Sequence, residues 1–516
     1  MEKRILLASV LSLVILLGYN AAIRKYYPAA KTKTAITSPQ TMSNLPEKTL
    51  VPEVAKPTVI QPISLESKEL ETKKLKIVFT NLGGRIKEVW FKDYNAKFFS
   101  GPSLNLESSQ DLPFQFVRSL PDFLVLSYQD GARKITKKFQ VKGDYLIGVE
   151  IIVEDLTGKK VDTRLKFSCF NLDLEALNKD PHWQKEKIYA EASISLPDKV
   201  LRINIARINA KSATDLPALV NWLGLRERYF CLLFKPEPAA MGYFVHPQSD
   251  KAIDIGLTLG NGVDTLKGVL YLGPQDSQIL AGNLPASEQI MNFGTFDPIS
   301  RLILKLLVLF HKVLPNWGLC IIALSAVIFL VLSPLTFKSM KSMRDMQKLQ
   351  PQIEALRKQH QNDPQKAQKE IMELYRKYKI NPFGGCLPLL LQIPIFFALY
   401  QALLRTVSLK GSSFLWIKDL SEPDRLMIFP SSIPILGNEL NILPILMAVI
   451  MLFQQKLSMK ITPSADPQQQ KFMMVFMPIL FGFMFYHFPG GLSLYWVVYS
   501  LLSLVFQWKQ NPTPSN

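Results

Sequence analysis

Side chains able to transfer protons are few in this 516-residue chain and lie far apart. The candidates are His182, Glu237, His246 and Asp250, all in the middle of the sequence. No two of them have motif-like spacing, whereas glycoside hydrolysis needs two carboxyl groups held on either side of the scissile bond. An enzyme acting on carbohydrate is therefore only a minor alternative for this region, and we do not expect catalysis.

Metal and nucleotide chemistry also lack their usual signatures. No cysteine and histidine cluster has zinc-site spacing, and no phosphate loop of the form G-x-x-x-x-G-K-[ST] occurs. We therefore expect no cofactor. Of the four cysteines, Cys320 and Cys386 fall in or beside apolar stretches. Cys169 and Cys231 could form a disulfide if their region faces an oxidising compartment.

Apolar residues gather in the C-terminal part of the chain. Several apolar runs there have roughly the length of 17–23 residues that crosses a bilayer. The predicted spans are 317–337, 383–404, 440–455, 472–488 and 491–508. A further apolar run at the N-terminus follows Lys3 and Arg4 and has no good cleavage site, so residues 1–23 are predicted to be a retained membrane anchor.

Between the anchor and these spans the sequence predicts a linker and then a β-rich domain. Residues 24–69 contain proline at short intervals with lysine, threonine and serine, which is typical of an extended linker. From residue 70, short β-branched and aromatic runs alternate with turns, and residues 77–91 have the pattern of a hairpin. Residues 70–290 are therefore predicted to form an all-β sandwich.

An amphipathic helix is predicted just before the first C-terminal span. Pro298 would lie in its first turn, and Ile303, Leu307 and Phe310 share one face of residues 297–313. Basic residues lie on its other faces. This pattern is typical of a helix that lies along a membrane surface.

The charges of the loops predict the orientation of the spans. Residues 338–382 carry eleven basic residues against five acidic ones and should be cytoplasmic, whereas residues 406–439 carry three against four and should face outside. Lys456 and Lys509 then mark the next loop and the C-terminus as cytoplasmic. The N-terminus is also predicted to be cytoplasmic, and the β-domain extracytoplasmic. Much of the net charge of +18 thus lies beside the membrane, which favours anionic headgroups over nucleic acid as its counterpart.

The cytoplasmic segment 338–380 predicts a helical hairpin, with helices at 338–359 and 364–379 that are separated near Asn362. Each helix has an apolar stripe and a basic face. The basic residues are Lys338, Lys341, Arg344, Lys348, Arg357, Lys358, Arg376, Lys377 and Lys379. This face is either a solvated surface that follows the positive-inside rule or a docking surface for substrates, ribosomal RNA or anionic lipid.

A transporter or channel with an external domain is the other alternative class. Such proteins carry ionisable side chains or broken helices within the membrane. No Asp, Glu, Lys or Arg lies in the middle of any C-terminal span. The sequence therefore disfavours this class.

Several short stretches, taken together in their order and spacing, resemble the YidC/Oxa/Alb insertase family. They lie at 316–318 (NWG), 334–336 (PLT), 349–351 (LQP), 381–388 (NPFGGCLP), 392–396 (QIPIF) and 488–492 (FPGGL). The likeness covers about residues 293–508. The large β-domain behind one anchor is similar to the arrangement in Gram-negative YidC, where that domain is periplasmic.

The resemblance implies an α-helical polytopic protein of the inner membrane with an extracytoplasmic all-β sandwich. Its core would be five helices within residues 317–508, followed by a short cytoplasmic tail at 509–516. The implied function is that of an insertase and chaperone for inner-membrane proteins, working without nucleotide through a hydrophilic groove open to cytoplasm and lipid. The implied partners are nascent inner-membrane proteins, Sec translocon subunits, the ribosome and anionic phospholipid, with a monomer as the working unit.

Six residues match positions that resemble the functional surfaces of the family. Ser325, Gln392, Tyr495 and Trp496 match the groove lining, and Phe396 and Met484 match an apolar slide along which a substrate helix would leave. Each has a plainer interpretation, because a serine can bond its own helix, a glutamine can bridge two helices, and aromatic and methionine side chains pack in any helical bundle.

Two features depart from the family pattern. Many members have an arginine where this chain has Phe329, so a positively charged groove is in doubt. Arg405 is the nearest replacement, but its place at the outer end of a span favours a side chain that extends to the interface. The tail after Lys509 has no further basic residue, so ribosome docking through a basic tail is not expected.

Overall fold

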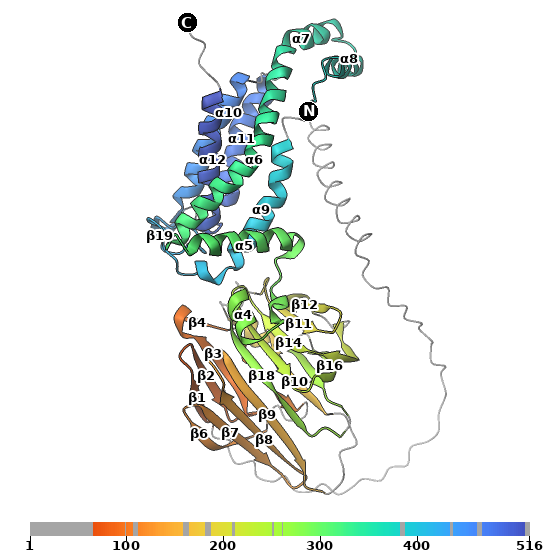
Figure 1. The fold of residues 1–516 in the computed structure, drawn as a ribbon, viewed down its shortest axis with the longest axis vertical. Helices are drawn as coiled ribbons and strands as arrows, with labels where there is room; N and C mark the ends of the chain where they lie inside the picture. Colours follow the sequence, from red (N-terminus) through yellow and green to blue (C-terminus); the bar gives the residue numbers. More distant parts are fainter. Residues whose placement is uncertain are drawn as a thin grey trace, which may run out of the picture. The chain divides into compact units, whose positions relative to one another are not determined.

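The computed structural model describes residues 65–510 with internal gaps (Figure 1). The gaps are 99, 107–111, 158–164, 181–186, 209–211, 250–251, 261, 382–386, 434–436 and 462–466. The predicted N-terminal anchor, most of the predicted linker, the last six residues, His182, Asp250 and Cys386 lie outside the described residues.

The β-domain is built mainly on a large antiparallel sheet of nine strands. In sheet order these are β12 (Val200–Asn204), β11 (Glu191–Ser195), β14 (Trp222–Arg226), β15 (Phe230–Pro236), β18 (Thr265–Pro274), β9 (Leu146–Asp155), β8 (Arg133–Val141), β7 (Phe123–Gln129) and β6 (Gln115–Leu120). Alternation along the strands points one face inward: in β8, Ile135, Lys137 and Phe139 are buried between half-buried neighbours.

Two smaller sheets complete this domain. A five-stranded sheet has the order β13 (Thr214–Val220), β16 (Ala240–Ser249), β17 (Ala252–Thr258), β10 (Lys166–Asp173) and β5 (Asn105–Leu106). A four-stranded sheet contains β1 (Ser67–Glu71), β2 (Leu75–Thr80), β3 (Arg85–Phe91) and β4 (Ala96–Lys97), in which β2 and β3 form the hairpin expected from the sequence. All three sheets contribute side chains to one continuous apolar core. The all-β prediction for this domain is confirmed.

Short helices connect or flank the strands and lead to the helical part. They are η1 (Lys92–Tyr94), α2 (Leu174–Lys179), η2 (Ile205–Arg207), α4 (Ser277–Asn283), η4 (Ser287–Ile290) and η5 (Gly294–Phe296). At α4 the carboxylate of Asp276 caps the helix by accepting hydrogen bonds from two backbone N–H groups, those of Gln278 and Ile279.

The two cysteines of the β-domain are buried free thiols. Cys169 lies on β10 and Cys231 on β15, in different sheets, and neither forms a disulfide. Burial raises the pKa of both thiols, so they stay protonated and act as small apolar side chains.

The helical part contains α5 (Asp297–His311), α6 (Trp317–Lys348), α9 (Leu387–Arg405), α10 (Ile442–Ile461), α11 (Pro467–Phe485) and α12 (Gly490–Gln510). A 3-10 turn, η6 (Val407–Leu409), and a small hairpin of β19 (Met427–Ile433) and β20 (Gly437–Leu440) lie in the connection from α9 to α10. The side chain of Asn316 caps α6 by accepting from the N–H groups of Gly318 and Leu319. Within the described residues, α6 and α12 are long and apolar enough to cross a membrane, and shorter apolar helices occur at 390–405, 442–457 and 474–485.

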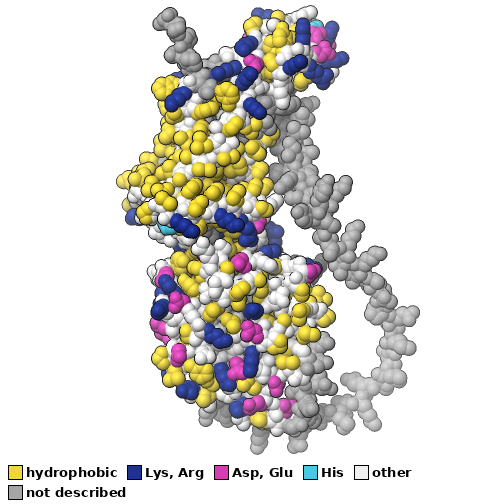
Figure 2. Space-filling model, in the orientation of Figure 1, with side chains coloured by type: hydrophobic (Ala, Val, Ile, Leu, Met, Phe, Trp, Pro, Cys, Tyr) yellow, Lys and Arg dark blue, Asp and Glu magenta, His cyan; other side chains and the backbone are white. Residues whose placement is uncertain are grey.

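Large apolar side chains cover much of the outside of these helices. Figure 2 shows an almost continuous hydrophobic surface over them, in contrast to the mixed charges of the β-domain. Examples are Leu330 and Val331 on α6, Phe453 on α10 and Phe483 on α11, each more than half exposed. A surface of this kind is compatible with lipid and not with water.

The amphipathic helix expected at 297–313 is α5, but its apolar face packs inward. Ile303 and Leu307 are buried in the core that α6 and α9 share, and the Ser300 hydroxyl donates to the Ala398 carbonyl on α9 at 2.9 Å. Leu302 and Leu309, on its other side, are exposed. The face with the strongest apolar pattern therefore anchors α5 to the bundle.

The helical hairpin predicted at 338–380 differs from the expected helix boundaries. α6 continues through the predicted start of the hairpin to Lys348 and reaches past its neighbours (Figure 1), and the hairpin consists of α7 (Gln350–Gln359) and α8 (Pro364–Lys377). The break falls at Leu349 because Pro351 has no N–H to donate to the carbonyl of Gln347, and its ring would clash with that carbonyl. The predicted single helix at 338–359 is therefore wrong.

Candidate functional site

The candidate groove residues come from helices that pack in one bundle. Ser325 lies on α6, Gln392 on α9, and Tyr495 and Trp496 on α12, which packs against both α6 and α9. The structure joins two of them directly, because the Gln392 amide donates to the Tyr495 hydroxyl at 2.8 Å. This hydrogen bond links the second and the last of the five predicted C-terminal spans.

Ser325 makes a local hydrogen bond. It is fully buried, and its hydroxyl donates to the Ile321 carbonyl one turn earlier in α6 at 2.7 Å. A serine that bonds to its own helix carries a polar oxygen into an apolar bundle without an unpaired proton. The hydroxyl oxygen still has acceptor capacity for a further donor.

Several other polar atoms of the bundle are buried and have no partner among the described residues. They are the second amide atom of Gln392 (Oε1), Oε1 of Gln401, Oγ of Ser493 and Nε1 of Trp496. Gln401 and Ser493 were not identified from the sequence, although each is a polar residue within an apolar helix, and that signal would have found them. Buried polar atoms without partners are costly, so water or a polar ligand is expected to reach them.

The two candidate slide residues differ in their surroundings. The ring of Phe396 on α9 lies 5.8 Å from that of Phe485 on α11 and 5.9 Å from that of Trp496, measured between ring centroids. Met484 is 42% exposed on the outside of α11. Phe396 therefore lies beside a groove candidate, and Met484 faces the surroundings of the bundle.

Phe329 is packed against aromatic rings. It is 9% exposed, and its ring makes edge contacts with Tyr499 and Phe506 of α12, both at a centroid distance of 5.8 Å. The place where many relatives have an arginine is thus part of the apolar contact between α6 and α12.

Arg405 does not reach this region. It ends α9, and its guanidinium donates to the backbone carbonyl of Asn292, in the segment between η4 and η5. The only charged side chain proposed to replace the missing arginine is therefore used to attach the end of α9 to the chain before α5.

The basic residues of the hairpin form an exposed surface. All nine predicted residues are described, and every one except the half-buried Arg344 is exposed. Lys348 is paired with Asp345 at 3.0 Å, and the hairpin has its own small core of Leu349, Ile353 and Ile371. His360 and Glu370 join α7 and α8 at 3.1 Å.

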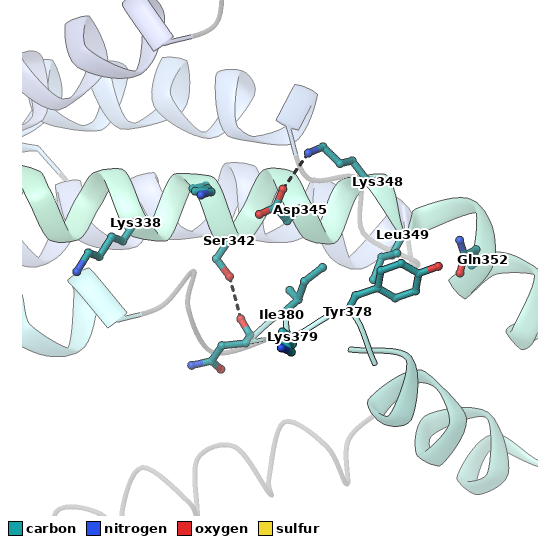
Figure 3. Close-up of a pocket in the computed structure, with 11 residues that line it drawn as sticks. Lys338, Ser342, Asp345, Lys348, Leu349, Gln352, Tyr378, Lys379 and Ile380 are labelled. Carbon is teal, nitrogen blue, oxygen red and sulfur yellow. Dashed lines mark hydrogen bonds and ion pairs between the residues drawn. The ribbon is translucent and has the colours of Figure 1, made fainter. Parts of the chain in front are cut away.

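Four of these lysines line a pocket of about 610 Å³ at the C-terminal end of α6, shown in Figure 3. Its lining residues are Lys338, Lys341, Ser342, Asp345, Lys348, Leu349, Gln352, Tyr378, Lys379, Ile380 and Asn381. The Ser342 hydroxyl donates to the Asn381 carbonyl at 2.9 Å and so joins its two walls. Among the described residues, no group of three or more His, Cys, Asp or Glu side chains could hold a metal ion.

Two protein families match this chain. The family described as the YidC periplasmic domain matches residues 120–306, and the 60Kd inner membrane protein family matches residues 309–514. A membrane protein insertase YidC of Maridesulfovibrio salexigens is 31% identical over 98% of this chain and 98% of that protein.

The chain belongs to the YidC family of membrane protein insertases.

The family expected from the sequence motifs is thereby confirmed, and so is the fold class. As a YidC insertase the chain is not an enzyme, and it is a protein of the inner membrane with a periplasmic domain. The YidC of Ralstonia nicotianae is 39% identical over 61% of this chain, and that alignment spans 55% of the relative.

Solved structures are also among the proteins to which this chain is similar. A crystal structure titled as an active YidC insertase with its first transmembrane domain resolved covers 87% of this chain and 94% of its own, at 20% identity and a TM-score of 0.40. A putative aldose 1-epimerase from Escherichia coli K12 covers 40% of this chain at 10% identity and a TM-score of 0.28. That second likeness is confined to the β-domain and gives no support to the carbohydrate alternative.

Proposed function

We propose that this YidC relative inserts proteins through a hydrophilic groove lined by Ser325, Gln392, Tyr495 and Trp496. Substrate helices leave along an apolar slide that includes Phe396 and Met484. The insertase acts on nascent inner-membrane proteins as they leave the ribosome, alone or with the Sec translocon, and it works as a monomer.

The physical reason is the cost of taking polar groups across hydrocarbon. Each unpaired backbone group or charge that enters the apolar layer costs several kcal/mol. Polar walls that extend part-way across the bilayer shorten that path. The apolar segment of the substrate then gains about 25 cal/mol for each Å² it buries in lipid, so no nucleotide is needed.

The observation that supports this proposal is the set of polar atoms without partners. Gln392 Oε1, Ser493 Oγ and Trp496 Nε1 are buried on α9 and α12 without a hydrogen-bond partner among the described residues. They include both an acceptor and a donor. Such atoms could pair with water, or with the polar flank of a passing substrate.

The proposal includes the orientation and the division of the chain. Both termini are cytoplasmic, with an anchor at 1–23, a linker at 24–69, the periplasmic domain at 70–290, the helix at 297–313, the core at 317–508 and the tail at 509–516. The lysines of the segment 338–380 then face the cytoplasm, where they follow the positive-inside rule.

Site-specific photo-crosslinking tests the path. A photoreactive residue at Phe396 or Met484 should crosslink to a single-span substrate held on a stalled ribosome. The matched control is Leu330, which is 65% exposed on α6 and carries no proposed role. Equal crosslinking from all three positions would mean that the substrate meets the bundle at random, and the proposed slide would be wrong.

A further inference from the structure

The pocket beside α6 has one wall from each of two segments that adjoin the membrane part. Lys338 directly follows the apolar run 317–337, and Asn381 lies shortly before α9. In Figure 3, Lys338, Ser342 and Asp345 come from α6, and Tyr378, Lys379 and Ile380 come from the segment that follows α8. The pocket is therefore attached to both helices at the point where they would leave the bilayer.

The charge in this pocket is unbalanced. It has four lysines and one carboxylate, and that carboxylate, Asp345, is already paired with Lys348. Within the described part of the chain, Lys338, Lys341 and Lys379 take part in no ion pair. Three exposed ammonium groups around one cavity attract an anion, and for a compact phosphate a lysine acts as a point charge.

The backbone at Lys379 supports a role for its charge. Lys379 has φ of 54°, in the left-handed region that favours glycine. This conformation ends α8 and lets the Ile380 N–H donate to the Tyr375 carbonyl at 2.9 Å. Glycine or asparagine would serve the turn alone, whereas lysine adds a positive charge to the pocket lining.

The depth of the pocket favours a lipid over a soluble anion. A helix rises about 1.5 Å per residue, so Lys338 and Lys341 lie within about 5 Å of one another along α6. The headgroup layer of one leaflet is roughly 5–8 Å thick. Because Lys338 directly follows the apolar run, these two lysines lie at the level where lipid phosphates are concentrated.

We propose that this pocket binds the phosphate of an anionic phospholipid headgroup from the cytoplasmic leaflet through Lys338, Lys341 and Lys379. The inference rests on the cytoplasmic orientation that the proposed function includes. The bound lipid bridges α6 and the end of α8, and so holds the hairpin at the membrane surface. The hydrogen bond from Ser342 to Asn381 keeps the two walls together when the lipid is absent.

Lipid binding by the full-length protein in neutral detergent tests this inference. Bound phosphatidylglycerol and phosphatidylcholine are counted by native mass spectrometry over a titration. The site variant combines Lys338→Gln, Lys341→Gln and Lys379→Gln. The matched control combines Lys358→Gln, Lys366→Gln and Lys369→Gln, which remove the same charge from exposed positions outside the pocket lining.

The expected result is preferential binding of phosphatidylglycerol that the site variant weakens about 100-fold, since each lysine near an anionic lipid contributes roughly fivefold. The control variant should bind within about twofold of the unmodified protein. Equal loss of phosphatidylglycerol binding in both variants would reveal a diffuse effect of charge and would overturn the proposal. Displacement of the lipid by equimolar inorganic phosphate would assign the pocket to a soluble anion and would overturn it as well. Because no substrate is present, failure of lipid binding leaves the insertion path to be judged by crosslinking.

Discussion

Gln392 is a residue at which stability and insertion can be separated. Its amide donates to Tyr495, and its other amide atom has no partner within the described residues. Replacing it by leucine removes one unpaired buried atom but leaves the buried Tyr495 hydroxyl without this partner, so the free energy of unfolding should fall by about 1–2 kcal/mol. We expect Gln392→Leu to reduce insertion several-fold, measured in reconstituted vesicles, while its melting temperature in detergent falls by only a few degrees.

A second interhelical glutamine provides the comparison for this variant. Gln454 on α10 donates to the Ser500 carbonyl of α12 at 3.1 Å and has no proposed role in the groove. Gln454→Leu should insert substrates at the unmodified rate. If both variants lose insertion in proportion to lost stability, Gln392 is only a structural bridge.

Phe329 tests whether water reaches the contact between α6 and α12. An arginine there would displace the edge contacts to Tyr499 and Phe506 and place a charge within an apolar helix, at a cost of about 3 kcal/mol. We expect Phe329→Arg to lower the melting temperature in detergent clearly, while Phe329→Leu costs less than about 1.5 kcal/mol. An unchanged melting temperature for the arginine variant would show that the contact is hydrated.

Lys137 is a buried cation that connects three parts of the β-domain. Its ammonium group donates to the carbonyls of Gly83 and Gly84 and to the side chain of Asn105, and lies 4.9 Å from the Phe114 ring centroid. Lys137→Met would leave these acceptors unpaired and should cost about 3 kcal/mol of unfolding free energy. The matched change Lys138→Met removes a surface ion pair with Glu150 and should cost less than about 1 kcal/mol.

The difference in stability between the unmodified protein and Lys137→Met should depend on pH with a definite sign. Burial, with a smaller effect from the charge of Arg85, lowers the pKa of Lys137 well below the usual 10.5. The unfolded chain therefore holds this proton more tightly than the folded chain, so the contribution of Lys137 to stability increases as pH rises toward 10.5. Thermal unfolding of the unmodified protein and of Lys137→Met over the alkaline range measures this contribution. A difference in stability that stays constant with pH would contradict the lowered pKa of Lys137.

At the scale of elements, the hairpin of α7 and α8 has a core separate from that of the bundle. Leu349, Ile353 and Ile371 are its only fully buried large apolar side chains among the described residues. Shortening one of them should therefore loosen the hairpin alone. We expect Ile353→Ala to cost about 2–4 kcal/mol locally and to raise amide hydrogen exchange in α7 and α8, with unchanged exchange in α9 and α12. Faster exchange throughout the bundle would mean that the two cores unfold together.

At the scale of the whole molecule, insertion should depend on the hairpin of α7 and α8 much more than on the β-domain. The β-domain has a large core of its own, and no groove or slide candidate lies in it. Deleting residues 70–290 while keeping α5 should leave most insertion in reconstituted vesicles, whereas replacing 350–377 by a flexible Gly/Ser segment of equal length should abolish it. Equal loss in both would count against a groove that works through the helical core.

The sequence by itself determined the class of protein, the presence of apolar helices in the C-terminal part and the strand-rich nature of the middle domain. Long apolar runs are stable only where water is excluded, in a bilayer or in a buried bundle. Alternating β-branched runs commonly form β-strands. These are local properties of the chain. For the same reason the observed helices α10 and α12 begin within two residues of the apolar runs that predicted them.

Only the tertiary structure decided what the individual polar and aromatic residues do. Whether Gln392 meets Tyr495, whether Phe329 faces rings or water, and whether Cys169 and Cys231 pair depend on the register between segments far apart in sequence. The lysine pocket has the same origin, since its walls are brought together by the hydrogen bond between Ser342 and Asn381. Hydrophobic periodicity shows which face of a helix is buried, but only packing determines which residues that face meets.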